Sequence, residues 1–207
     1  MAHVVRPITR RYLVVKRAFD LTLVILLFPL IALVLVVCGL AIRLDSPGPI
    51  MYVQERTGRH GKRFLMYKFR TMVRNAGEMK EQLRHLSIVP PPDFKIPNDP
   101  RITRVGRFLR QTSLDELPQI LNVVRGEMSL VGPRPTSFHA DTYQLWHTER
   151  LEVPPGITGL WQIMGRNAAT FDQRLRLDIA YIDRMSLGFD LWIIIQTLKS
   201  VFKRLGA

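Results

Sequence analysis

The longest apolar segment of the chain, residues 21–42, contains no charged side chain. As a straight helix it would be roughly 33 Å long, close to the thickness of the hydrocarbon core of a bilayer. A soluble domain of 207 residues rarely buries so long a helix on all sides, which disfavours a soluble core helix. No small-residue cleavage site follows the run, which disfavours a signal peptide. The sequence therefore predicts a membrane segment.

The flanks of this segment bear on its topology. Pro29 lies inside the run, and a proline within a helix removes one backbone hydrogen bond and is predicted to kink it. Residues 1–20 and residues 43–63 each contain five lysines or arginines. A spanning helix usually has an excess of positive charge on its cytoplasmic side, whereas a kinked helix that re-enters the same leaflet places both flanks there. Both topologies remain open at this point.

The formal charge of +13 implies an anionic partner, which can be nucleic acid, phospholipid headgroups or a phosphorylated substrate. No helix-turn-helix, RRM or zinc-finger pattern accompanies the charge, so nucleic acid is disfavoured as a partner. The sequence lacks the HExxH, GxGxxG and P-loop motifs of zinc hydrolases and common nucleotide-binding folds. The single cysteine, Cys38, excludes an intrachain disulfide.

The rest of the chain predicts an α+β fold that is mainly helical. Residues 50–56 and 63–70 are rich in β-branched and aromatic residues and flank a glycine-containing turn, which predicts a β-hairpin. Helices are predicted at residues 73–86, 104–109, 137–151 and 171–185. The last segment, residues 189–205, has apolar residues at helical spacing opposite lysine and arginine, which is typical of a helix at a membrane interface. Packing of this helix on the protein's own core is the alternative.

Adjacent carboxylates, Asp115 and Glu116, follow a segment rich in arginine. Arginines match phosphate oxygens with paired donors, and carboxylates can hold Mg²⁺ or attack phosphorus. The alternative is structural, because Ser113 and Glu116 have the spacing of a capping box at a helix N-terminus. Capping does not explain the arginines upstream or the stiff GPRP loop of residues 132–135, whose two prolines would hold Arg134 in place.

These motifs resemble the bacterial sugar transferase family, the monotopic phosphoglycosyl transferases, from residue 16 nearly to the C-terminus. The matching motifs, in chain order, are KRAFD (16–20), SPGP (46–49), QERxG (54–58), KFRTM (68–72), DPR (99–101), SLDELP (113–118), SLVGPRP (129–135), GITG (156–159) and LDxxY (177–181). One departure is Phe28 before Pro29, where many short family members have serine.

The resemblance implies a Mg²⁺-dependent reaction in two steps. Asp115 would attack the phosphate that bears the sugar of a UDP-sugar, releasing UMP, and undecaprenyl phosphate would then accept the phosphosugar. Asp115 and Glu116 would also hold the metal. By the same resemblance, the remaining site residues are Lys68, Arg110 and Arg134 near the phosphates, Gln162 and Arg166 near the nucleoside, and Asp178 without a defined role.

The resemblance also implies a place in the cell. A re-entrant helix within residues 16–45, bent at Pro29, would hold a catalytic part, residues 46–188, at the cytoplasmic face of the bacterial inner membrane. The phospholipid would be a partner of residues 189–205. The tripeptide at 160–162 resembles hexose-1-phosphate transferases, which favours UDP-glucose or UDP-galactose. The glycan pathway (exopolysaccharide, capsule or O-antigen) and any homo-oligomer remain open.

Overall fold

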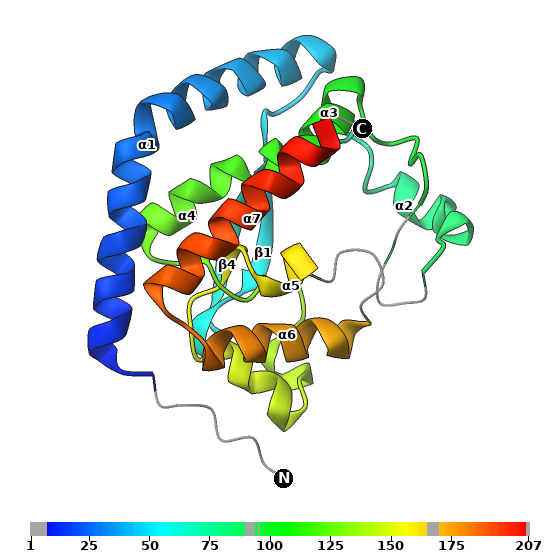
Figure 1. Cartoon of the computed structure of the whole chain (residues 1–207). Helices are drawn as coiled ribbons and strands as arrows, with labels where there is room; N and C mark the ends of the chain where they lie inside the picture. The colour runs from blue at the N-terminus through cyan, green and yellow to red at the C-terminus, as the bar shows by residue number, and fades with distance from the viewer. Residues whose placement is uncertain (1–7, 90–93, 95, 165–169, 206–207) are drawn as a thin grey trace.

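The computed structural model describes residues 8–89, 94, 96–164 and 170–205, with only the backbone of 202–205. Its longest element is α1 (Arg10–Asp45), which begins after Thr9, whose hydroxyl accepts a hydrogen bond from the Tyr12 amide at 3.3 Å. The helix continues through Pro29, yet it consists of two arms that meet at a sharp bend near its middle (Figure 1). The predicted kink is confirmed.

The first arm of α1 is fixed to the body by buried polar contacts. Lys16 Nζ lies 2.6 Å from Asp190 of α7 (Leu187–Leu205), and both side chains are buried. One turn later, Asp20 accepts a hydrogen bond from the Ser129 hydroxyl at 2.6 Å. Pairing offsets part of the cost of burying these groups, although Asp20 Oδ1 has no hydrogen-bond partner among the described residues. The KRAFD motif therefore anchors the helix.

The end of the second arm is fixed to the same body. Asp45 accepts a hydrogen bond from the Val105 amide at 3.1 Å. Arg70 donates to the carbonyls of Ser46 and Pro47, each at 2.7 Å. Because both ends of α1 are held, the bend lies between two attached ends and is not the tip of a free helix.

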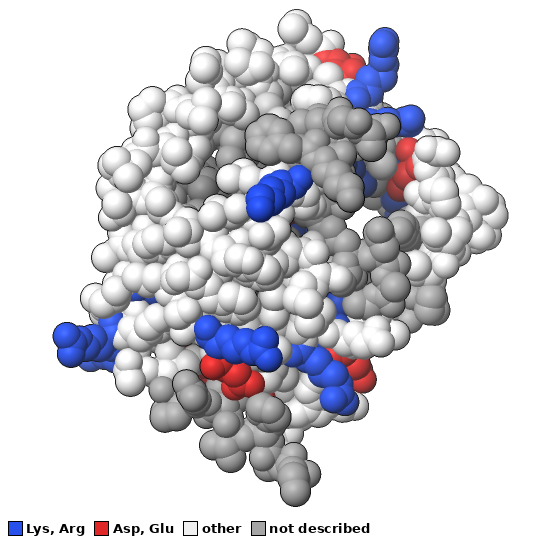
Figure 2. All heavy atoms as spheres, in the orientation of Figure 1, with Lys and Arg blue, Asp and Glu red and all other residues white. Residues whose placement is uncertain are grey.

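Between these attachments α1 exposes a continuous apolar surface. Its large exposed apolar side chains are Ile25, Leu26, Leu27, Phe28, Leu30, Leu33, Val36, Val37 and Leu40. No charged side chain appears on the surface over the two arms between their ends (Figure 2). The helix is long and apolar enough to cross a membrane, and only 17% of its most apolar window is buried. The alternative of a soluble core helix is therefore wrong.

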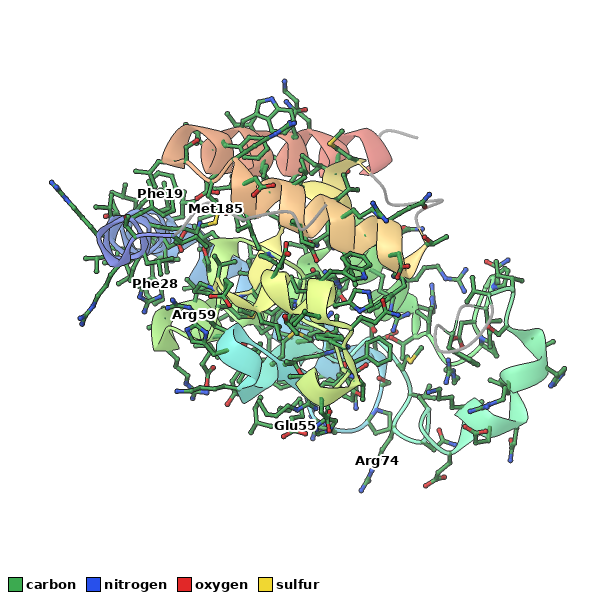
Figure 3. All side chains as sticks on the ribbon, turned by 90° about the horizontal axis from the view of Figure 1, so that it is seen from below. Phe19, Phe28, Glu55, Arg59, Arg74 and Met185 are labelled. Atoms are coloured by element: carbon green, nitrogen blue, oxygen red, sulfur yellow. The ribbon has the colours of Figure 1, made fainter. Side chains whose placement is uncertain are left out.

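The predicted hairpin is confirmed as β1 (Met51–Thr57) and β2 (Arg63–Phe69). The strands are antiparallel, with Met51 opposite Phe69 and Thr57 opposite Arg63. In Figure 3, Glu55 of this hairpin lies on one side of the molecule, and α7 lies on the other beside α6 (Phe171–Asp183). Site motifs occur in both layers, because Lys68 lies in β2 and Asp178 lies in α6.

Helix α3 (Arg104–Thr112) confirms the short helix predicted at 104–109. It packs directly on the backbone that follows β2, because a Cβ on Gly106 would lie 2.1 Å from the Thr71 carbonyl oxygen. After α3 come a 3₁₀ helix, η3 (Leu114–Gln119), and α4 (Ile120–Arg125). Two short parallel strands follow, β3 (Ser129–Val131) and β4 (Gly156–Thr158).

Two predicted helices are wrong in length or kind. Within residues 73–86 the structure has only α2 (Met79–Gln82) and the 3₁₀ turn η2 (Arg84–Leu86). Residues 137–151 form the 3₁₀ segments η4 (Ala140–Thr142) and η5 (Leu145–Leu151), not an α-helix. Another 3₁₀ turn, η1 (Arg59–Gly61), closes the hairpin, and α5 (Leu160–Met164) follows β4. The α6 prediction is confirmed.

Helix α7 packs on the protein's own core along one face, which was the alternative for the C-terminal segment. Ile193 is fully buried in a core cluster with Val131 and Tyr181, so one face packs on the protein. A second face leaves apolar side chains exposed at Leu191, Trp192, Ile195 and Leu198. The predicted apolar positions 202 and 205 lie outside the described side chains.

Candidate active site

The two adjacent carboxylates stand where α3 gives way to η3. Ser113 ends α3 in the left-handed conformation, with φ 60°, and its side chain makes no capping hydrogen bond. The capping box predicted from Ser113 and Glu116 is therefore wrong. The sharp turn instead directs η3 against β2, and it leaves both carboxylates available for other contacts.

Glu116 is the centre of an ion-pair cluster. Lys68 Nζ, from β2, lies 2.9 Å from Glu116 Oε1, and Arg134 Nη1 lies 3.0 Å from Oε2. Arg134 Nη2 also donates to Oε1, so the guanidinium binds both oxygens. Burial alone would raise the pKa of Glu116, but the charges of Arg134 and Lys68 and their hydrogen bonds lower it well below its usual range. Glu116 is therefore ionised.

Asp115 is in a different situation. Its side chain is half-buried, and no donor among the described residues lies within hydrogen-bond distance of its carboxylate. Burial raises the pKa of Asp115, the neighbouring Glu116 charge raises it further, and Lys68, Arg110 and Arg134 act in the opposite direction. The site thus holds one carboxylate neutralised by cations and one whose oxygens are not engaged by any residue that the structure describes.

Arg110 approaches the cluster from α3. Its Nε donates to the Thr71 hydroxyl at 2.8 Å, and its charge acts on Asp115 without a direct ion pair. The structure therefore brings together all three predicted phosphate-binding residues, from β2, α3 and the loop after β3, around the carboxylate pair.

The Arg134 loop is held by the parallel pairing of β3 with β4. The Gly132 amide donates to the Thr158 carbonyl, and the Gly156 amide donates to the Pro133 carbonyl, both at 2.9 Å. A Cβ on Gly156 would lie 2.0 Å from the Gly132 nitrogen. The two glycine-containing motifs, 132–135 and 156–159, therefore need glycine for close backbone approach.

Asp178 supports the same loop from α6. It is fully buried and accepts two hydrogen bonds from Arg150, at 3.1 and 2.7 Å. Arg150, itself buried, also donates to the Arg134 carbonyl. Burial raises the pKa of Asp178 to about 6 in spite of the Arg150 charge. This geometry makes Asp178 a positioning residue behind Arg134.

We expect Asp178→Asn to flatten the pH dependence of stability between pH 5 and pH 8. The folded-state pKa of about 6 exceeds the value of ~3.9 for an unfolded aspartate, so acidification across this interval should stabilise the wild type by about 1 kcal/mol through this group. Apparent melting temperatures of detergent-solubilised protein at both pH values measure this. Asp141→Asn, at an exposed position, is the matched control. An unchanged pH dependence in Asp178→Asn would contradict the assignment.

The predicted nucleoside residues are not confirmed as such. Gln162 is buried, and its Nε2 donates to the Ile157 carbonyl at 3.1 Å. It lies beside an apolar groove that includes residues of α1 and α7, and it does not line the pocket next to Arg134. Arg166 lies outside the described residues.

The DPR motif is structural. Asp99 and Arg101 form a buried ion pair, with Arg101 Nη2 2.7 Å from Asp99 Oδ2. Arg101 also donates to the Ala76 carbonyl at 3.2 Å, which fixes the loop before α3. Of the arginines between the DPR motif and the carboxylate pair, Arg110 is the one whose charge is seen to act on Asp115 among the described residues.

The carboxylate pair fits one mode of magnesium binding. Within the described residues, no group of three or more His, Cys, Asp or Glu side chains could hold a metal ion. Mg²⁺ is commonly held by one or two carboxylates together with substrate phosphates and waters, without an all-protein cage. The free oxygens of Asp115 suit that mode. Glu116 would bind the Mg²⁺ ion as well only if Lys68 or Arg134 left Glu116 to contact a substrate phosphate.

Sequence reasoning missed two residues near Arg134. Arg150 gave no local signal, because its partner Asp178 lies 28 residues away. Arg56 was noted only as part of the QERxG motif. It lies in β1, and burial and the nearby Arg134 charge lower its pKa. Since cationic side chains repel one another, an arginine held beside Arg134 is a sign of an anion-binding role.

Comparisons with known proteins identify the relatives of this chain. The bacterial sugar transferase family model matches residues 11–204. A Salmonella typhimurium protein named undecaprenyl-phosphate galactose phosphotransferase is 44% identical over 93% of the chain and 41% of its own length. A Komagataeibacter xylinus undecaprenyl-phosphate glucose phosphotransferase is 41% identical over 96% of the chain and 38% of its length. The exopolysaccharide production protein ExoY of Sinorhizobium fredii is 40% identical over 90% of the chain and 84% of its length. The chain spans about two-fifths of the first two relatives.

Proposed function

The chain belongs to the bacterial sugar transferase family, and we propose that it transfers a hexose 1-phosphate from a UDP-sugar to undecaprenyl phosphate, releasing UMP. This reaction would begin assembly of a surface glycan, such as exopolysaccharide, capsule or O-antigen. The observation that carries the proposal is the division of roles at the site. Glu116 is neutralised by Lys68 and Arg134, while the oxygens of Asp115 beside it have no partner within the described part of the chain.

In the first step, an Asp115 oxygen attacks the phosphorus atom that bears the sugar. The bond from that phosphorus to the bridging oxygen breaks, and its electron pair leaves with UMP. Attack by a carboxylate on a diphosphate is opposed by charge repulsion, which the cluster of Lys68, Arg110 and Arg134 would reduce. The product is an acyl phosphate that links Asp115 to the sugar phosphate.

In the second step, a phosphate oxygen of undecaprenyl phosphate attacks the same phosphorus atom. The bond to Asp115 breaks, its electron pair returns to the carboxylate, and the lipid diphosphate sugar is the product. A covalent intermediate lets a soluble donor and a lipid acceptor use one phosphate site in turn, which predicts ping-pong kinetics.

We propose Mg²⁺ as the cofactor, held by Asp115 together with substrate phosphate oxygens. Glu116 would assist when one of its cationic partners moves to a phosphate. When bound, the ion would offset the negative charge on the phosphates during transfer. Lys68 and Arg134 would meanwhile hold the diphosphate near the carboxylate pair, since both already contact Glu116.

An apolar groove of about 320 Å³ supports a lipid acceptor. It lies between the first arm of α1, with Leu23 and Leu27, and α7, with Leu198. Glu116 lines the same groove, so a phosphate at the cationic cluster would have its hydrocarbon directed between two membrane-facing helices. The rest of the long chain would stay in the bilayer.

The release of UMP tests the proposal. Purified protein with Mg²⁺ and undecaprenyl phosphate should release UMP from UDP-glucose or UDP-galactose, the sugars suggested by the names of the relatives. UDP-N-acetylglucosamine serves as the comparison donor. A non-catalytic membrane adaptor, the competing function, predicts no UMP with any donor, and that result would overturn the proposal.

For topology, we propose that α1 re-enters the cytoplasmic leaflet of the inner membrane, because both of its ends are attached to one body and its bend lies between them (Figure 1). Single cysteines at Arg10 and His60, on a Cys38→Ala background, should react with an impermeant maleimide from the same side of sealed vesicles. Pro29→Leu should favour a straight helix and reduce the labelling at one position. Labelling from opposite sides in the Pro29 protein would rule out re-entry.

A further inference from the structure

A polar pocket of about 210 Å³ adjoins the Arg134 loop and is not used by the transfer steps above. One wall is formed by residues 134–138, and another by the start of α6 with Phe171 and Arg174. Arg56 of β1, Trp161 of α5 and the buried Asp178 also line the pocket. Asp115 and Glu116 do not line it, so the pocket neighbours the phosphate site without being part of it.

Aromatic rings form much of this pocket. Phe138 and Phe171 meet edge to face, with ring centroids 5.3 Å apart, which fixes the Phe171 ring. The Arg174 guanidinium lies 5.7 Å from the Trp161 ring centroid and 5.8 Å from that of Phe171. Trp161 and Phe171 are only partly buried, so part of each ring remains accessible. Such surfaces suit a planar ring that can stack.

The charge of the pocket favours an anion beside that ring. Four arginines line it, at positions 56, 134, 150 and 174, against the single carboxylate of Asp178. Asp178 is already paired with Arg150, and Arg134 is paired with Glu116 across the boundary of the pocket. Arg134 therefore belongs to both sites. An extended ligand could occupy both sites at once and contact the Arg134 guanidinium between them.

We propose that this pocket binds the nucleoside end of the donor, with the base against Trp161 and Phe171 and the adjacent phosphate near Arg134 and Arg56. The proposal rests on the proposed function, and it assigns the nucleoside to residues other than Gln162, which lines the apolar groove and not this pocket. A sugar ring can also contact aromatic faces. The pocket is better suited to the base, because the sugar is attached to the phosphate that Asp115 attacks, and Asp115 lies outside the pocket.

The experiment compares two soluble probes, UMP and ribose 5-phosphate, which differ by the base. Isothermal titration with the full detergent-solubilised chain gives both affinities. Stacking on one aromatic side chain predicts that Trp161→Ala weakens UMP binding about tenfold, with ribose 5-phosphate nearly unchanged. Phe171→Leu should act in the same direction, and Trp161→Phe should restore most of the affinity. Trp192→Ala, on the exposed face of α7, is the matched control.

Kinetics separate this proposal from the proposed function. If the wild type releases UMP from UDP-glucose, Trp161→Ala should raise the KM for that donor about tenfold and change kcat much less. Unchanged UMP affinity in both Trp161→Ala and Phe171→Leu would overturn the nucleoside assignment while leaving the reaction intact. The nucleoside assignment would also be overturned if these variants changed only the preference between UDP-glucose and UDP-galactose, because that result would place the sugar in the pocket. Failure of the wild type to turn over any UDP-sugar would overturn both proposals.

Discussion

Replacement of Asp115 by asparagine is expected to abolish both UMP release and lipid transfer. Asparagine keeps the shape of the side chain but removes the nucleophilic oxygen, and no other described carboxylate at the site is free of cationic partners. We expect a residual rate below about 10⁻³ of wild type, as is found when a covalent nucleophile is removed. Rates of UMP release with and without undecaprenyl phosphate measure the two steps.

Intact-protein mass spectrometry identifies the residue that reacts. Incubation with UDP-sugar and Mg²⁺, without lipid, should add one hexose phosphate to the wild type, and peptide mapping should place it on Asp115. Glu116→Gln is the matched control, because it neutralises the adjacent carboxylate and leaves the proposed nucleophile, so a slower adduct should still form. An adduct on another residue, or turnover by Asp115→Asn, would overturn the mechanism.

Asp115→Asn should not unfold the protein, which makes its activity interpretable. Burial and the Glu116 charge raise the pKa of Asp115, so the ionised form is disfavoured by folding, and asparagine removes that cost. The variant should therefore melt at the same temperature as the wild type or higher. Such a gain in stability on loss of function is typical of groups that are held in an unfavourable environment for catalysis.

The long apolar helix and the hairpin could be predicted from the sequence, because their signals are local. An uncharged run with an internal proline predicts a bent apolar helix, and alternating strands around Gly58 and Gly61 predict a hairpin. The helices predicted at 73–86 and 137–151 were wrong because helical periodicity also fits 3₁₀ turns and irregular segments. Tertiary contacts decide the backbone in such regions.

The site was predictable in composition but not in arrangement. The residue pattern indicated Asp115, Glu116 and Arg134, and the resemblance added Lys68. The structure brings them together although Lys68 and Glu116 are 48 residues apart. The capping box failed because the positive φ of Ser113 belongs to the end of the preceding helix. The left-handed conformation of Ser113 depends on how η3 packs on β2, and no local sequence pattern encodes that packing.

Replacement of Arg134 by lysine is expected to reduce activity strongly, because it removes the paired donors of the guanidinium. Arg134→Lys keeps the charge, but an ammonium group cannot contact both oxygens of Glu116 and a phosphate with the planar geometry of a guanidinium. We expect kcat/KM for the UDP-sugar to fall at least about tenfold, which corresponds to about 1.4 kcal/mol of transition-state stabilisation. Arg107→Lys, at an exposed position on α3, is the matched control and should be nearly neutral.

A double-mutant cycle shows whether Arg134 acts through Glu116 or on the substrate. If the guanidinium only neutralises Glu116, then Arg134→Lys should cost little once Glu116→Gln has removed that charge. If Arg134 also binds phosphate during transfer, as its position between the carboxylate and the polar pocket indicates, Arg134→Lys should remain costly in the Glu116→Gln background. We expect the second result. Near-wild-type turnover by Arg134→Lys alone would reduce the GPRP loop to a scaffold for η3.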